Sequence, residues 1–352
     1  MLQKHFISLI KPATKIVAVT TFMAVVSSLA QAQEPITLRL HHFLPPSAPM
    51  HEFLSDWADR VNDQSDNRLD VKVYPSMQLG GKPPALYDQV KNGQVDIGWA
   101  VPGYTINRFP KAEVFDIPLI GRSAEVTSQA GYAFFEKHLQ DEFDDVRMIN
   151  YFTNPPCMLN SQRRVKTPSD LQGMKIRASN RTVSAFFQAA GAQPMSIPVP
   201  AAPEALSRGV LEGITLPFEA AVSLRIEELT DYQISFNSAN DEGFCTTSHV
   251  IVMNKDRYES LPEDLRKVID DNSGLDEARQ IGRFLDESDA KAIAAYEGNN
   301  EFFTIGPDEI DPWREVADQV TKDWIDDMNS RGYEGQALYE DAKELIEKYA
   351  GQ

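Results

Sequence analysis

The sequence predicts an α/β fold built as two similar lobes. Short apolar segments that alternate like strands are separated by segments with helical spacing, and this pattern occurs in both halves of the chain. The chain has 352 residues, of which 42% are hydrophobic, so it is too long for one ordinary core and can bury a core in each of two domains. From Leu261 onward the pattern becomes mainly helical and acidic.

In the first half, strands and helices are predicted to alternate. The predicted strands cover residues 36–40, 69–73 and 95–101, and the predicted helices cover 53–61 and 83–91. Ser47 is expected to cap the first helix, because its hydroxyl can accept a hydrogen bond from a free backbone N–H group. Pro83 and Pro84 suit the first turn of the second helix, and Gly93 is expected to end it.

The second half repeats this order of elements. Strands are predicted over 147–152 and 174–178, helices over 181–190 and 204–208, and a further strand after Gly213. The segment Asn92-Gly-Gln-Val-Asp96 resembles Arg208-Gly-Val-Leu-Glu212, since each places a glycine at a helix end and an acid at a strand start. Chance also explains so short a likeness, but two similar α/β lobes would produce it.

The C-terminal part is predicted to consist of helices. One begins at Pro262, a long one covers 275–297, another begins at Asp311-Pro312, and the last covers 337–349. Trp313, Trp324 and Met328 fall on one side of the third of these helices. This spacing indicates a stripe that packs into a core and not a cofactor site.

The N-terminus predicts export from the cytoplasm. Residues 1–32 carry three lysines and no acid, and an apolar run from Ile16 to Leu29 ends in Ala30-Gln31-Ala32. A positive start, a short apolar run and a small-x-small site are typical of a signal peptide, so we expect cleavage near Ala32. A membrane anchor is the alternative, but the run is short for a spanning helix and is interrupted by threonine and serine.

Charge limits the classes of partner. The chain has 34 basic and 52 acidic residues, and removal of the signal-peptide lysines leaves 31 basic residues and a net charge of −21. An acidic surface repels phosphate backbones and anionic lipid, so we expect no nucleic-acid partner. After residue 33 no apolar run is long enough to span a bilayer, and the mature protein is expected to be soluble.

The motifs of common enzymes do not occur in the sequence. It lacks the nucleophile elbow, the phosphate-binding glycine loop and the His-Glu-x-x-His pair. His41 and His42 are adjacent, and as strand neighbours they would point to opposite faces, while His51, His138 and His249 are isolated. We therefore expect no catalytic residues, no metal ligands and no cofactor.

Two cysteines and one arginine are candidates for special roles. Cys157 and Cys245 both lie in the exported part, where either a disulfide or two buried thiols is consistent with the count. Arg177 ends the predicted strand 174–178, just before a helix begins near Ser179. A guanidinium there can bind a carboxylate through two parallel hydrogen bonds. Strand spacing alone also allows a solvated surface arginine.

Six segments in order resemble the solute receptors of tripartite ATP-independent periplasmic (TRAP) transporters, the DctP family. They are Tyr74-Pro-Ser-Met-Gln-Leu-Gly80, Gly93-Gln-Val-Asp96, Phe115-Asp-Ile-Pro118, Asp170-Leu-Gln-Gly-Met-Lys-Ile-Arg177, Gly191-Ala-Gln-Pro194 and Leu261-Pro-Glu-Asp-Leu265. The likeness covers essentially the whole mature chain. It implies two α/β lobes joined by strands that cross twice, a long helix that spans both lobes, and lobe closure around one ligand.

The resemblance also implies lobe boundaries and partners. Lobe I would comprise residues 33–154 and 248–287, and lobe II residues 155–247 and 288–352. Arg177 would be the family arginine that pairs with the carboxylate of the ligand. The partners would be a small and a large membrane subunit, on which the receptor docks without inserting, and uptake would be driven by an ion gradient.

Departures from the family pattern indicate the kind of ligand. Members that bind sialic acid carry a second arginine where this chain has Asn154-Pro-Pro-Cys-Met158, and other polar ligand-binding groups of those members are replaced here by apolar or aromatic residues. We therefore expect a monocarboxylate with an apolar or aromatic body. Trp99, Tyr104 and Phe218 are the candidate walls of the pocket and Asn154 is a candidate polar contact, although each could equally pack in a core.

The resemblance places Cys157 and Cys245 on the two strands that cross between the lobes, where a disulfide is geometrically allowed. The function expected from all these features is capture of a small organic carboxylate for a TRAP transporter. A receptor for an ATP-driven importer or a sensor is an alternative. A periplasmic enzyme that acts on an organic acid is a further one.

Overall fold

The computed structural model describes residues 34–236, 242–296 and 300–351. Residues Pro35–Gln352 form one compact unit, and every element below lies in it. Within the described ranges, no helix combines the length and the apolar character that a membrane span requires. The predicted signal peptide lies outside the described residues.

The first sheet is mixed and contains five strands. They are β1 (Ile36–His41), β2 (Leu69–Tyr74), β3 (Ile97–Ala100), β4 (Val146–Thr153) and β10 (Ser248–Asn254), and they lie in the order β2-β1-β3-β10-β4. β1 pairs in parallel with β2 and β3, whereas β10 runs antiparallel between β3 and β4. A strand from late in the chain thus completes a sheet that the early residues begin.

The second sheet has six strands in the order β11-β9-β5-β8-β6-β7. They are β5 (Met158–Ser161), β6 (Lys175–Ala178), β7 (Gln193–Ser196), β8 (Gly213–Leu216), β9 (Tyr232–Phe236) and β11 (Glu301–Ile305). β6 pairs in parallel with β7 and β8, and β5 runs antiparallel between β8 and β9. The two sheets confirm the predicted α/β class with two lobes.

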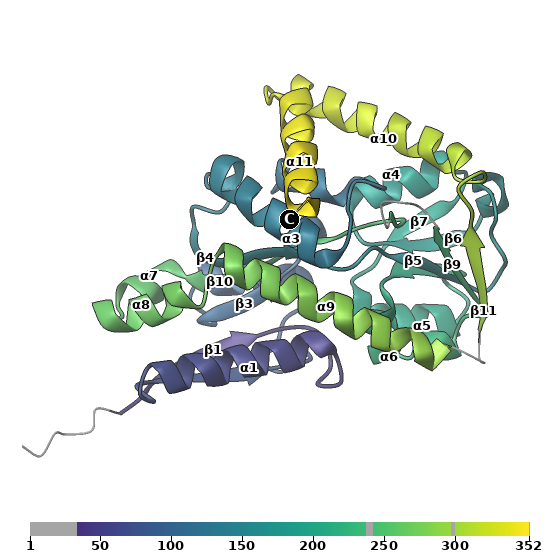
Figure 1. Cartoon of the computed structure of the whole chain (residues 1–352). Coiled ribbons are helices and arrows are strands. Elements are labelled where there is room, and N and C mark those ends of the chain that lie inside the picture. The colour runs from purple at the N-terminus through teal and green to yellow at the C-terminus, as the bar shows by residue number, and fades with distance from the viewer. Residues whose placement is uncertain (1–33, 237–241, 297–299, 352) are drawn as a thin grey trace, which may run out of the picture. The chain divides into compact units, whose positions relative to one another are not determined.

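Helices surround both sheets (Figure 1). They are α1 (Pro49–Gln64), α2 (Leu86–Lys91), α3 (Ala124–Phe134), α4 (Arg181–Ala189), α5 (Ala202–Ser207), α6 (Phe218–Ser223), α7 (Lys255–Glu259), α8 (Glu263–Asp271), α9 (Leu275–Tyr296), α10 (Asp311–Ser330) and α11 (Gly335–Ala350). Short 3₁₀ turns follow β3 at Pro102–Tyr104 and precede α3 at Ala112–Asp116.

Helix α9 is the long helix that spans both lobes (Figure 1). It packs against α3 and β4 of the first lobe and against α6 of the second. Gly282 allows the close crossing with α3, because a Cβ atom at this position would lie 2.4 Å from the carbonyl oxygen of Ala124. The helix therefore packs against elements of both lobes.

Two segments cross between the sheets and lie against each other. Residues 154–157 connect β4 to β5, and residues 242–247 lead into β10. The N–H of Cys157 donates to the carbonyl of Cys245 at 2.7 Å, and the N–H of Phe244 donates to the carbonyl of Cys157 at 2.9 Å. A disulfide joins Cys157 and Cys245, whose Cα atoms are 5.0 Å apart.

Each lobe has its own aromatic core. In the first, Phe115 packs edge-on against Phe134 and near Tyr151. In the second, the buried rings of Phe186, Phe187, Phe244 and Trp313 pack together. Trp313, Trp324 and Met328 of α10 are all buried, which agrees with the predicted core stripe.

Some local predictions were wrong. Ser47 does not cap α1, because the helix begins at Pro49 with Ala48 at the N-cap, and the Ser47 hydroxyl donates to the carbonyl of Ser223 instead. Proline at the first position, whose missing N–H needs no partner, replaces the expected cap. The strand predicted over 95–101 is shorter and covers Ile97–Ala100.

Candidate functional site

A cavity lies where the two sheets and the crossing segments meet. Side chains of the first lobe line one part of it: Leu44, Met50, Trp99, Tyr104, Phe152, His249 and Leu285. Side chains of the second lobe line the other: Arg177, Ser179, Val199, Thr215, Leu216, Pro217, Glu219 and Ala220. Asn154, Cys157 and Thr247 of the crossing segments complete the lining, which is mostly apolar.

Arg177 supplies a buried positive charge to this cavity. Its strand, β6, alternates as predicted, so that Ile176 and Ala178 are fully buried on the opposite face while Lys175 is exposed. Arg177 is only 2% exposed because the segment with Tyr104 and the loop before Val199 cover it. Burial lowers the pKa of Arg177 from its usual value, but guanidinium groups remain protonated in proteins.

The hydrogen bonds of Arg177 hold the guanidinium without neutralising it. Nε donates to the carbonyl of Ile197 at 2.9 Å, Nη1 to the carbonyl of Thr215 at 3.5 Å, and Nη2 to the hydroxyl of Tyr104 at 3.3 Å. All three acceptors are uncharged, and among the described residues no carboxylate forms an ion pair with Arg177. A buried charge without a counterion is strongly unfavourable, so the cavity is prepared for an anion.

Tyr104 connects the first lobe to the second. Its hydroxyl accepts hydrogen bonds from Arg177 and from the backbone N–H of Val199, at 3.2 Å. The preceding residue is Gly103, where a Cβ atom would lie 2.7 Å from the Cβ of Asn180 in the second lobe. A second link is the ion pair between Arg181 and Glu113, at 2.5 Å. The two lobes are therefore in contact through Tyr104 and through this ion pair.

His249 is a neutral polar group in the cavity wall. The indole Nε1 of Trp99 donates to Nδ1 of His249 at 3.1 Å. Since indole can only donate, Nδ1 must be the acceptor and the proton of neutral His249 lies on Nε2. Burial, together with the nearby charge of Arg177, lowers the pKa of His249 to about 3. The ring also stacks on Phe152, with centroids 5.1 Å apart.

Glu219 is the buried acid of the cavity. It lies in the first turn of α6, and its Oε2 is buried without a hydrogen-bond partner among the residues that the structure describes. Burial, with a smaller contribution from Asp289, raises the pKa of Glu219 to about 8. Thr215 in the preceding strand β8 also has a buried hydroxyl that has no partner among the described residues. Buried polar groups without a partner are uncommon in folded proteins.

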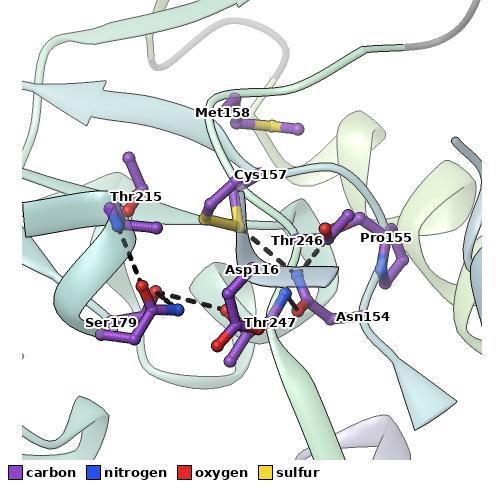
Figure 2. The surroundings of a disulfide bond; sticks show 12 residues. Asp116, Asn154, Pro155, Cys157, Met158, Ser179, Thr215, Thr246 and Thr247 are labelled. Carbon is purple, nitrogen blue, oxygen red and sulfur yellow. Dashed lines mark hydrogen bonds between the residues drawn. A yellow bond between two sulfur atoms is a disulfide. The ribbon is translucent and has the colours of Figure 1, made fainter. Parts of the chain in front are cut away.

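Asn154 and the disulfide join the crossing segments beside the cavity (Figure 2). The side-chain oxygen of Asn154 accepts from the N–H of Thr247 at 2.7 Å, and its amide donates to the carbonyl of Pro155 at 2.6 Å and approaches Sγ of Cys157 at 3.4 Å. The polar atoms of Asn154 thus serve mainly to hold the two segments together.

Four of the five predicted ligand-binding residues line the cavity, namely Arg177, Trp99, Tyr104 and Asn154. The ring of Phe218 packs instead against Tyr296 and Phe302, with centroids 5.1 Å and 5.8 Å away, while its neighbours Pro217 and Glu219 face the cavity. His249, Glu219 and Thr215 were not expected. Within the described part of the chain, no three His, Cys, Asp or Glu side chains are grouped as metal ligands.

Comparison with known families gives a match over most of the chain. The sequence model of bacterial extracellular solute-binding protein family 7, DctP, matches residues 40–327. This is a family of periplasmic solute receptors, not of enzymes.

Solved structures of TRAP solute-binding proteins are closely similar. One from Rhodoferax ferrireducens, in complex with copurified benzoate, is 37% identical with a TM-score of 0.88 over 90% of this chain and 99% of its own. A marine metagenome protein specific for aromatic acid ligands, with 3-hydroxybenzoate, is 35% identical with a TM-score of 0.87 over 90% and 99%. One from Bordetella bronchiseptica, with bound mandelate, is 27% identical with a TM-score of 0.82 over 89% and 99%.

Proposed function

This chain belongs to bacterial extracellular solute-binding protein family 7, and we propose that it is a TRAP receptor for a small monocarboxylate with an aromatic body. One observation carries the proposal: the guanidinium of Arg177 is buried in a mostly apolar cavity and has no counterion among the described residues. The aromatic acids bound by the receptors from Rhodoferax ferrireducens and the marine metagenome support the choice of ligand class.

The charges of the cavity suit a single carboxylate. Arg177 is the only lysine or arginine among the described residues that line it, and His249 is neutral because its pKa is lowered to about 3. The fork of Arg177 would hold the carboxylate, and the Nε2–H group of His249 is a second, uncharged donor. A dicarboxylate would leave one negative charge unpaired in the apolar part, at a high desolvation cost.

The aromatic side chains suit a flat, apolar ligand body. Trp99, Phe152 and His249 are in mutual ring contact, with centroids 5.1 Å to 6.4 Å apart, and Leu44 and Met50 extend this wall. A ligand ring would bury apolar surface against this wall and could adopt offset or edge-to-face contacts. Small aliphatic acids would bury less area and bind more weakly.

Closure of the lobes would exclude water from the bound carboxylate. The contacts of Tyr104 with Arg177 and Val199 join the lobes at the cavity, and the ion pair of Glu113 with Arg181 joins them outside its lining. In an open form these contacts would break and Arg177 would be hydrated. Capture of the anion would then favour the closed form, because the ligand contacts both lobes only there.

The protein would be exported, with cleavage of the signal peptide near Ala32, and would deliver its ligand to a small and a large membrane subunit for uptake driven by an ion gradient. It would carry out no reaction of its own.

The test is to identify the ligand and measure binding. The mature protein is purified and the ligand retained through purification is identified by mass spectrometry, and aromatic and aliphatic acids are then screened by thermal shift. Benzoate at 100 times its dissociation constant should stabilise the protein by about 2.7 kcal/mol. Binding of dicarboxylates or sugars but not of aromatic monocarboxylates would contradict the proposed ligand class.

A further inference from the structure

The wall of the cavity formed by β8 and the start of α6 carries two polar atoms that lack hydrogen-bond partners among the described residues. The hydroxyl Oγ1 of Thr215 and the carboxyl Oε2 of Glu219 are buried, and neither has a hydrogen-bond partner in the part of the chain that the structure describes. Thr215 is 0% and Glu219 6% exposed, and both line the cavity. Because a buried polar group without a partner is costly, these atoms are expected to gain partners when the cavity is filled.

The Thr215 hydroxyl and the Glu219 carboxyl differ in their relation to Arg177. The carbonyl of Thr215 accepts a hydrogen bond from Arg177, so the Thr215 hydroxyl belongs to the end of the cavity where a carboxylate would bind. Glu219 comes four residues later, beyond Leu216 and Pro217, and it forms no hydrogen bond or ion pair with Arg177. Its side chain is therefore available to the body of a ligand whose carboxylate is held by Arg177.

The surroundings of Glu219 favour an uncharged carboxyl group. Among the described residues no cation forms an ion pair with it, and the nearby acid Asp289 accepts the backbone N–H of Glu219 at 3.0 Å. Burial raises the pKa of Glu219 to about 8, so the side chain is mainly protonated at neutral pH. A protonated carboxyl can donate one hydrogen bond and accept others, as a hydroxyl group can.

We propose that Glu219 is a specificity-determining residue that binds a hydroxyl group on the body of the ligand, so that the receptor prefers hydroxylated aromatic monocarboxylates to unsubstituted ones. This inference rests on the proposed function. The hydroxyl would satisfy Oε2, whereas an unsubstituted ring would leave that atom unpaired. A site that forms a hydrogen bond with a substrate hydroxyl discriminates well against the analogue that lacks it.

Binding of matched probes to the full mature protein tests this inference. The probes are benzoate, the three hydroxybenzoates, the three methylbenzoates, phenylacetate, mandelate and 3-(aminomethyl)benzoate, titrated calorimetrically at pH 7. We expect at least one hydroxylated acid to bind about 10- to 100-fold more tightly than its unsubstituted parent and its methyl analogue.

Variants assign that preference to Glu219. In Glu219→Leu the preference should fall to about onefold, while the parent acid should bind at least as tightly as to the wild type. Glu219→Gln should keep most of the preference, because an amide also donates and accepts. Glu204→Gln is the control, because Glu204 is an exposed acid of α5 that pairs with Arg208 away from the cavity.

The outcomes separate the two proposals. If aromatic acids bind but no hydroxylated acid is preferred, or if the preference survives in Glu219→Leu, the role of Glu219 is overturned and the proposed function stands. Tighter binding of 3-(aminomethyl)benzoate than of the hydroxybenzoates would also overturn it, since it would indicate an ionised Glu219. If none of the acids binds, the proposed function itself fails. Should Glu219→Leu not fold, the wild-type series and Glu219→Gln decide.

Discussion

The indole N–H of Trp99 donates a hydrogen bond to Nδ1 of His249, 3.1 Å away, inside the cavity. Trp99 was predicted to be a wall of the pocket, but this bond gives it a second role, because it fixes which nitrogen of His249 carries the proton. The free donor, Nε2–H, belongs to a side chain that lines the same cavity as Arg177. One charged and one neutral donor are thus available to an anionic ligand.

Replacement of Trp99 by phenylalanine should weaken ligand binding through His249. Phenylalanine would keep an aromatic ring at this position, but His249 would lose the N–H donor that fixes its tautomer. We therefore expect roughly fivefold to tenfold weaker binding of benzoate. Calorimetry measures the affinity and nitrogen NMR of the His249 ring reports the tautomer. Trp324→Phe is the control, because Trp324 is a buried tryptophan of α10 whose Nε1 has no hydrogen-bond partner within the described ranges. Unchanged binding and an unchanged tautomer in Trp99→Phe would contradict this role.

Ligand affinity should fall as the pH rises through about 8. Burial raises the pKa of Glu219 to about 8, so the group is neutral below this pH and becomes negative above it. The added negative charge would repel the carboxylate bound at Arg177. Benzoate affinity measured from pH 6 to pH 9.5 should decline at the alkaline end in the wild type and stay flat in Glu219→Gln. An equal decline in both proteins would assign the effect to another group.

His42 and His249 should each reduce the free energy of unfolding as the pH falls from about 6.5 toward about 3, while buried acids such as Glu219, whose pKa is raised to about 8, act in the opposite direction. Burial lowers the pKa of His42 and of His249 to about 3, below the value of about 6.5 in an unfolded chain. In this window the unfolded state binds more protons than the native state, so each histidine removes up to about 1.4 kcal/mol of stability per pH unit. Urea denaturation across this pH range should show that the wild type loses more free energy of unfolding than His249→Gln does for each unit by which the pH is lowered. If the free energy of unfolding depends on pH equally in both proteins, His249 makes no such contribution.

Loss of the disulfide should destabilise the protein. Cys157 and Cys245 are 88 residues apart, and closing a loop of that length contributes about 4–5 kcal/mol in the chain-entropy model. The double variant Cys157→Ser/Cys245→Ser should therefore unfold at lower urea concentration, although the paired backbones of the crossing segments keep their hydrogen bonds. Two free thiols in the unfolded, unreduced wild type would show that the bond does not form.

The sequence predicted the elements that local spacing defines. The alternation over 174–178 placed Arg177 opposite Ile176 and Ala178, and the glycines at 93 and 191 ended helices, where both adopt positive φ. Local spacing did not predict β10, which pairs with β3 and β4 across long sequence separations and supplies His249. Local spacing contains no information about such pairing.

The candidate site was predicted in part for the same reason. Arg177, Trp99 and Tyr104 came from one strand end and from family resemblance, and they meet in one cavity. Glu219 was missed because its importance depends on burial without a partner, which only the fold determines. Phe218, one residue away, is an example of how the turn after β8 selects which side chain faces the cavity. The predicted lobe boundaries stay a prediction.

The central claim is that the buried guanidinium of Arg177 binds the carboxylate of the ligand. The most direct measurement is the affinity of Arg177→Ala for the acid that binds the wild type best, with Arg208→Ala as a control, since Arg208 is an exposed arginine of the second lobe. Loss of one partner of a buried ion pair costs about 3–5 kcal/mol, so we expect affinity to fall by roughly two to four orders of magnitude. An Arg177→Ala protein that is folded and binds the acid as tightly as the wild type would contradict the claim.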